Sequence, residues 1–236
     1  MLPHGTDIPS GHFPSVGCDV YPRRRMGEAA CYACSDCFPI DSERLALFTG
    51  GASTKTEPAA GMLAKVRSGI RESGAQFASI CGTLKTLNEG MMREQVRAFV
   101  PCMFAVLNVA TRELSVGSAG SEPMVVFSHK TRKVQRVNPR GVAVGFSAGP
   151  VFERSFEEQS FTLDPGDRIV MYTSEVFEAS NSERAGSGDE MLDTFVRENA
   201  ERSSAEFLGM LAAQMATHGA TTQDNLDSAM VTLRLR

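Results

Sequence analysis

The chain has 236 residues, of which 42% are hydrophobic and 22% are charged, a composition typical of a soluble globular protein that can bury a sizeable core. Its formal net charge of -4 and its pI near 5.7 argue against binding to a nucleic-acid backbone, which needs a concentrated excess of Lys and Arg. No apolar run approaches the roughly 20 residues of a membrane helix, and the first residues lack the pattern of a signal peptide, so the sequence predicts a cytoplasmic protein that does not enter a membrane.

The segment CYACSDC, residues 31–37, contains three cysteines at even spacing: Cys31, Cys34 and Cys37. A C-x2-C-x2-C run also begins a ferredoxin-type signature, but that signature needs a fourth cysteine close by, and position 41 is Asp41. On a strand, residues three apart face opposite sides, so these cysteines would not share a metal without a loop between them. We keep a cysteine-based metal or redox module as one alternative, and we predict that the three sulfur atoms do not converge.

Strand-like and helix-like patterns then follow in chain order. The apolar run 44–48 predicts a strand that ends in the turn-like residues TGGAST. Apolar residues that recur at intervals of three and four predict helices over 59–71 and 76–89. The further predicted strands are 99–109, 114–118, 124–127, 160–163, 168–173 and 229–235, and the further predicted helices are 190–199 and 205–217. Since no internal repeat, low-complexity tract or linker is present, the pattern predicts a single domain over residues 1–236, of the α+β class.

Five segments, in this order, resemble the metal-dependent (type 2C, PPM) serine/threonine protein phosphatases of the bacterial SpoIIE and RsbU branch. The opening MLP is similar to the start of that branch, and CFPIDSERLALFTGG to its stretch from a Gly-Gly-Asp strand to a Gly-Asp-x-Ser-Gly loop. The third segment, FVPCMFAVLNVATRELSVGSAGSEP, is similar to a strand pair that ends in Asn-Ala-Gly-His. The fourth, LDPGDRIVMYTSEVFEASN, is similar to a Pro-Gly-Asp strand that leads to Tyr-Thr-Asp-Gly. The fifth, LDSAMVTLRLR, is similar to a closing Asp-Asp strand. The resemblance implies a β-sandwich of two mainly antiparallel sheets flanked by α-helices, in α-β-β-α layers.

The resemblance also implies where a metal site would lie. In that family four aspartates hold two Mn2+ or Mg2+ ions, and the water that bridges the ions becomes the hydroxide that attacks a phosphoserine or phosphothreonine. Carried onto this sequence, the four positions are Ala33, Gly51, Ser174 and Leu226. None of the four is a carboxylate, so we expect vestigial positions, no catalytic residue, no bound metal and no other cofactor.

The predicted function is therefore that of a pseudophosphatase, a signalling domain that binds a protein in a partner-switching or sigma-factor-regulation pathway. The partner that the resemblance implies is a STAS-domain regulator or a sensor domain. A homodimer with a second copy of the chain is a further alternative. The alternative is an active Mn- or Mg-dependent serine/threonine phosphatase with a non-standard site. Its fallback ligands would be the neighbouring acids Asp36, Glu175 and Asp227.

Overall fold

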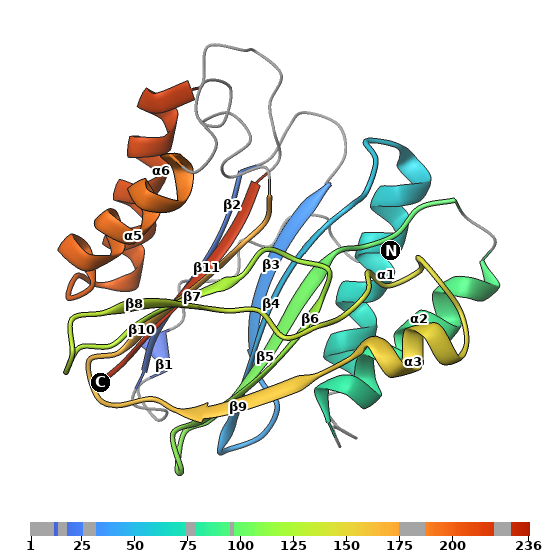
Figure 1. Cartoon of the computed structure of the whole chain (residues 1–236), viewed down its shortest axis with the longest axis horizontal. Coiled ribbons are helices and arrows are strands. Elements are labelled where there is room, and N and C mark those ends of the chain that lie inside the picture. Colours follow the sequence, from blue (N-terminus) through green and yellow to red (C-terminus); the bar gives the residue numbers. More distant parts are fainter. Residues whose placement is uncertain are drawn as a thin grey trace.

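The computed structural model describes residues 12–13, 18–25, 32–73, 79–94, 97–174, 187–219 and 228–236. The strands within these residues form two sheets in which each strand pairs antiparallel with its neighbours (Figure 1). The first sheet has the order β1-β2-β11-β10-β7-β8, with strands β1 (His12–Phe13), β2 (Cys18–Arg25), β7 (Met124–Phe127), β8 (Val134–Val137), β10 (Arg168–Tyr172) and β11 (Ser228–Leu235). The second sheet has the order β3-β4-β5-β6-β9, with strands β3 (Ala33–Pro39), β4 (Arg44–Gly51), β5 (Cys102–Asn108), β6 (Glu113–Ala119) and β9 (Glu158–Thr162).

Helices cover the outer faces of both sheets (Figure 1). Helices α1 (Glu57–Ser73) and α2 (Ile80–Arg93) pack on the second sheet, and α5 (Ser187–Asn199) and α6 (Ser204–Gly219) pack on the first. The short helix α3 (Pro150–Ser155) lies in the connection from β8 to β9. The layers are therefore helix, sheet, sheet, helix, which confirms the predicted sandwich.

Strand β4 shows why the sequence gives this layering. Its apolar residues do not alternate with polar ones, because both faces of the strand are buried. Leu45 and Leu47 point into the core between the two sheets, whereas Ala46 and Phe48 point into the core beneath α1 and α2. A third core, which includes Phe207 of α6, joins α5 and α6 to the first sheet.

The structure shifts one predicted helix and adds elements that the apolar pattern did not reveal. Helix α2 begins at Ile80 and not at 76, because the Ser79 side chain caps it by accepting a hydrogen bond from the Gly82 N–H at 3.0 Å. Part of the predicted start, residues 76–78, lies outside the described residues. Strand β5 begins after Pro101, which cannot donate to the ladder. The added elements are β1, β2, β3, β8 and α3, of which β3 was implied by the family resemblance alone.

Within the part of the chain that the structure describes, the helices are all too short or too polar to span a lipid bilayer.

Candidate functional site

The ends of β3 and β4 bring two of the predicted metal positions together. Ala33 and Gly51 are direct partners in the antiparallel pair. They lie on the face of the second sheet that points toward the first, since Cys37 and Leu47, four residues away along each strand, are in the core between the sheets. Carboxylates at these two positions would therefore stand side by side at the end of the sandwich.

Backbone hydrogen bonds fix the chain beyond β4. The Gly51 N–H donates to the Pro101 carbonyl at 3.0 Å, and the Ala52 N–H donates to the Tyr32 carbonyl at 2.7 Å. Ser53 bonds to Phe99 twice, because its N–H donates to the Phe99 carbonyl and its hydroxyl accepts from the Phe99 N–H, each at 3.0 Å. Residues 51–53 are thus hydrogen-bonded both to the residue before β3 and to the chain before β5.

Ser174, the third predicted position, is held at the end of β10 in the other sheet. The residue before it, Thr173, is joined to β11 by two hydrogen bonds, since its N–H donates to the Ala229 carbonyl at 3.0 Å and its hydroxyl accepts from the Ala229 N–H at 3.1 Å. This pairing sets the direction in which the chain leaves the sheet at Ser174.

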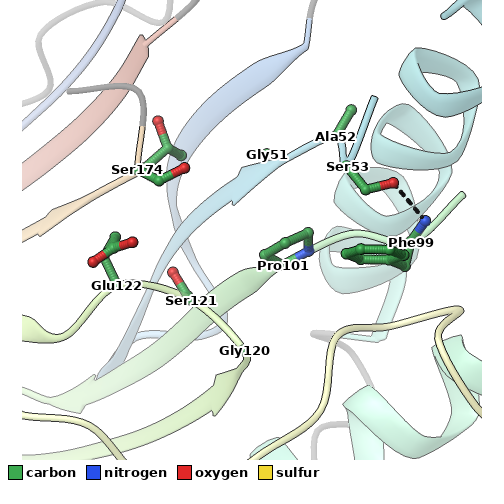
Figure 2. Close-up of a pocket in the computed structure, with 10 residues that line it drawn as sticks. Gly51, Ala52, Ser53, Phe99, Pro101, Gly120, Ser121, Glu122 and Ser174 are labelled. Carbon is green, nitrogen blue, oxygen red and sulfur yellow. Dashed lines mark hydrogen bonds between the residues drawn. The ribbon is translucent and has the colours of Figure 1, made fainter. Parts of the chain in front are cut away.

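A cavity of about 270 Å3 joins these segments at one end of the sandwich (Figure 2). We call it the end cavity, and its described lining is Gly51, Ala52, Ser53, Phe99, Pro101, Gly120, Ser121, Glu122, Thr173 and Ser174. Figure 2 shows Ser174, Ser121 and Glu122 on one side of it, with Ser53 and Phe99 on the other. The structure thus brings Gly51 and Ser174 to one cavity, with Ala33 paired to Gly51.

The donor chemistry of the end cavity is that of hydroxyls and backbone groups. Among its described lining residues, Glu122 is the one acid. Burial raises the pKa of the neighbouring Tyr172 hydroxyl to about 12, and the charge of Glu122 adds to this while Arg136 opposes it. Across the described residues, no three His, Cys, Asp or Glu side chains converge as a metal-binding group. Two hard dications need several carboxylate oxygens, so the described residues do not fit the pair of metal ions that the family uses.

Asp36, a fallback metal ligand in the sequence analysis, lies elsewhere. Its side chain is 1% exposed and belongs to the face of β3 that meets α1. Arg67 donates to its Oδ2 at 2.8 Å, and Arg71 donates to Oδ2 and Oδ1, both at 2.5 Å. We therefore correct that assignment, because the carboxylate is already neutralised by two guanidinium groups away from the end cavity.

The cysteines of β3 separate as predicted for those that the structure describes. Cys34 lies in the core under α1 and α2, and Cys37 lies in the core between the sheets, so their sulfur atoms face opposite sides of the strand. Burial raises the pKa of the Cys37 thiol well above its ordinary value, which disfavours the thiolate that a metal or a redox reaction needs. Cys31 lies outside the described residues.

Three acids or metal positions from the sequence analysis remain untested by the geometry. Glu175, Asp227 and Leu226 lie outside the described residues. Conversely, Glu122 and Phe99 line the end cavity without having been singled out. The sequence signal for Glu122 was its place directly after the turn that follows β6, where side chains at the end of a sheet gather.

Comparisons with known proteins agree with this architecture. Residues 41–236 match the family model described as Stage II sporulation protein E (SpoIIE). A search of curated proteins gives no match.

Solved structures share the fold at low sequence identity. The RsbU and RsbW domains of a Mycobacterium tuberculosis protein superpose with a TM-score of 0.76 at 18% identity, over 93% of this chain and 60% of that chain. The PP2C phosphatase domain of SpoIIE from Bacillus subtilis, with a fragment of its regulatory domain, gives 0.78 at 12% identity, over 92% of this chain and 61% of that one. The SiaA-PP2C domain of Pseudomonas aeruginosa gives 0.78 at 13% identity, over 95% and 88%.

This chain thus spans about 60% of the length of the first two structures and most of the third. The family match covers well over half of the chain, and the sandwich with its two layers of helices is the one that these phosphatase domains have. The chain belongs to the SpoIIE family and has its PP2C-type phosphatase fold.

Proposed function

We propose that the chain, as one PP2C-type domain, is a catalytically inactive member of its family that acts in cytoplasmic signalling by binding a protein partner. The observation that carries this proposal is the chemistry of the end cavity. Gly51 and Ser174 line it and Ala33 adjoins it, at positions where the resemblance expects metal-binding carboxylates. In the family's reaction the metal pair supplies the attacking hydroxide, and hydroxyl groups do not replace it.

The kind of partner is inferred from relatives. One similar structure holds RsbU and RsbW domains in the same protein, and another comes from a study of the bacterial stressosome. In this proposal the domain keeps its fold without its metal ligands and recognises a phosphorylated regulator by its surface. A STAS-domain regulator in a partner-switching or sigma-factor pathway is the partner that this proposal names.

The first test is metal-dependent activity of the unmodified chain. With millimolar Mn2+ or Mg2+ and a phosphoserine peptide, we expect no hydrolysis above the rate without protein, because a lone acid such as Glu122 does not build a bridged pair of ions. Metal-dependent turnover that is lost in Glu122→Gln, Glu175→Gln or Asp227→Asn would overturn the proposal in favour of an active phosphatase with a displaced site.

The second test restores the missing ligands. In the variant Ala33→Asp, Gly51→Asp, Ser174→Asp and Leu226→Asp, the first two new carboxylates would face each other across the β3–β4 pair, where like charges destabilise. We expect a lower melting temperature in a chelator and its recovery on adding Mn2+, measured by thermal denaturation. Gly61→Asp is the matched control, since Gly61 is exposed on α1 with open space around it, and its melting temperature should not respond to Mn2+.

A further inference from the structure

A second cavity, of about 410 Å3, lies beside the end cavity and shares Gly120 and Ser121 with it. Its walls come from three segments: the end of β6 with the following turn (118–121), the chain after β8 (138–142), and the end of α3 (154–155). We call it the arginine cavity, because Arg140 and Arg154 line it.

The charge of the arginine cavity is opposite to that of its neighbour. Its described lining holds two guanidinium groups and no acid, whereas the described lining of the end cavity holds Glu122 and no cation. Hydrophobic side chains are few in it, since the lining consists mainly of serine, asparagine, glycine and arginine residues. A cavity of this composition suits a small anion better than a metal ion or an apolar ligand.

The two arginines differ in their pairing. Arg140 donates from Nε to Oε1 of Glu157 at 2.9 Å and from Nη2 to the same oxygen, and its carbonyl accepts from the Glu157 N–H at 2.9 Å. Its position is therefore held, and part of its charge is offset. Arg154 is exposed and has no hydrogen bond or ion pair to any residue that the structure describes. Its guanidinium is thus the available cation of this cavity.

Close packing fixes the wall that carries Arg140. A Cβ added to Gly141 would lie 1.7 Å from the Ser118 carbonyl oxygen, so the chain after β8 presses directly against the end of β6. At the same end, Gly120 has a φ of 70°, which turns the chain from β6 toward Ser121. The Ser118 hydroxyl accepts from the Ser121 N–H at 3.3 Å, which leaves its own proton to donate.

We propose that the arginine cavity binds a phosphate monoester dianion, such as the phosphoryl group of a phosphoserine, without a metal ion. Guanidinium groups form paired, charge-assisted hydrogen bonds to phosphate oxygens, and here they supply the positive charge that the family otherwise takes from two dications. The proposal rests on the proposed function and deepens it, because it names the chemical group by which a partner would be recognised.

The neighbouring surface offers a place for the residues that flank the phosphoryl group. Phe146 is 62% exposed, and its ring meets the ring of Phe99 edge to face with centroids 5.3 Å apart. Phe99 also lines the end cavity, which shares Gly120 and Ser121 with the arginine cavity, so an apolar surface lies across the end cavity from that shared wall (Figure 2). A phosphopeptide would gain apolar contact there, which free phosphate would not.

The test is binding by the full chain in the presence of a chelator, so that hydrolysis and metal binding do not contribute. Isothermal titration would compare inorganic phosphate, a phosphoserine peptide and the same peptide without its phosphate. We expect saturable binding of the phosphorylated peptide, weakened at least about tenfold in Arg154→Gln and less in Arg154→Lys, which keeps the charge but not the paired hydrogen bonds. Raising the salt concentration should weaken binding in the wild type more than in Arg154→Gln.

Arg197→Gln is the matched control, because Arg197 is an exposed helical arginine on α5, which packs on the other sheet. The affinity of this variant for the phosphorylated peptide should equal that of the wild type. Equal affinity of wild type and Arg154→Gln, or equal affinity for the two peptides, would overturn the arginine cavity as a phosphoryl site while leaving an inactive protein-binding domain intact. Binding of inorganic phosphate as tightly as the peptide, with the same dependence on Arg154, would support the site and assign it to small phosphates. Metal-dependent turnover would instead contradict the proposed function alone.

Discussion

At the scale of single residues, Asp36 joins β3 to α1 by charge. Its carboxylate is 1% exposed, and the two arginines that neutralise it, Arg67 and Arg71, are 32% and 41% exposed. The hydrogen bond to Asp36 raises the pKa of Arg71, whose guanidinium also lies 4.8 Å from the centre of the Phe38 ring. Such a buried charge is tolerated only while its partners remain in place.

We therefore expect Asp36→Asn to lower the free energy of unfolding by about 2 kcal/mol, below the usual cost of breaking a buried ion pair because both arginines can turn to water. Arg71→Met should cost less, because Arg67 still neutralises the carboxylate, and the double variant should cost less than the sum of the two. Urea denaturation measures all three. The matched control is Glu94→Gln, which removes the exposed ion pair of Glu94 with Lys65, and a loss there as large as in Asp36→Asn would contradict the argument.

At the scale of elements, the strands and helices that the sequence predicted are those with a clear apolar pattern, either a regular period or a continuous run as in β4. Strand β2 was missed because its sequence, CDVYPRRR, holds a proline and three arginines. Its described neighbour β1 pairs only with Cys18 and Asp19. Pro22 therefore pairs with Val231 on one side and has no described strand on the other, and a strand tolerates proline at such an edge position. Sequence period alone does not reveal such an arrangement, because it depends on where neighbouring strands end.

One contact between elements is a specific link from α2 to the chain that follows β8. The Asn88 side chain, 2% exposed, donates to the Ser147 carbonyl at 2.9 Å and accepts from the Gly145 N–H at 2.8 Å. Gly145 has a φ of 86°, and a Cβ there would lie 2.8 Å from the end of the Met62 side chain. The segment 145–147 is thus fitted closely against α1 and α2.

Asn88→Ala should leave the Gly145 N–H and the Ser147 carbonyl without their partner, at a cost of about 2 kcal/mol in the free energy of unfolding. Asn88→Asp keeps an acceptor for Gly145 but loses the donor, so it should preserve more of the protection at that amide. Hydrogen exchange over residues 141–149 measures this effect. Asn108→Ala removes a similar side-chain link in the turn between β5 and β6, and it should leave exchange over 141–149 unchanged.

At the scale of the whole molecule, the resemblance and buried strands such as β4 were enough to predict the layers of the fold. They were not enough to predict which side chains line the end cavity. Ala33, Gly51 and Ser174 come from two sheets, and the sequence placed them by analogy with a motif, one at a time. Glu122 was overlooked, and Asp36, a fallback ligand in the sequence analysis, lies on the opposite face of β3 from Ala33, because a carboxylate near a motif does not reveal which face it occupies. The arginine cavity joins residues more than 30 positions apart, such as Ser118 and Arg154, and only the fold brings them together.

The interior of the molecule also holds thiols that affect stability as a group. Burial raises the pKa of Cys18 and of Cys102 from 9.0 to about 12, and that of Cys37 still further. Above pH 9 the unfolded chain releases thiol protons that the folded protein keeps. The contribution of these thiols to the free energy of unfolding is therefore fully present below pH 9 and is lost as the pH rises toward 12.

At pH values above the ordinary pKa of a thiol, we expect each such thiol to lower the free energy of unfolding by about 1.4 kcal/mol per pH unit. Cys102→Ala should remove the contribution of one thiol to this slope. Cys102 is the clearest choice because burial alone raises its pKa. Urea denaturation under reducing conditions, at pH values on both sides of 9, measures the slope. Cys81→Ala is the control, since Cys81 is only partly buried and should contribute less. Parallel pH profiles for wild type and Cys102→Ala would mean that the thiol loses its proton equally in both states, and that the core around β5 admits water as the pH rises.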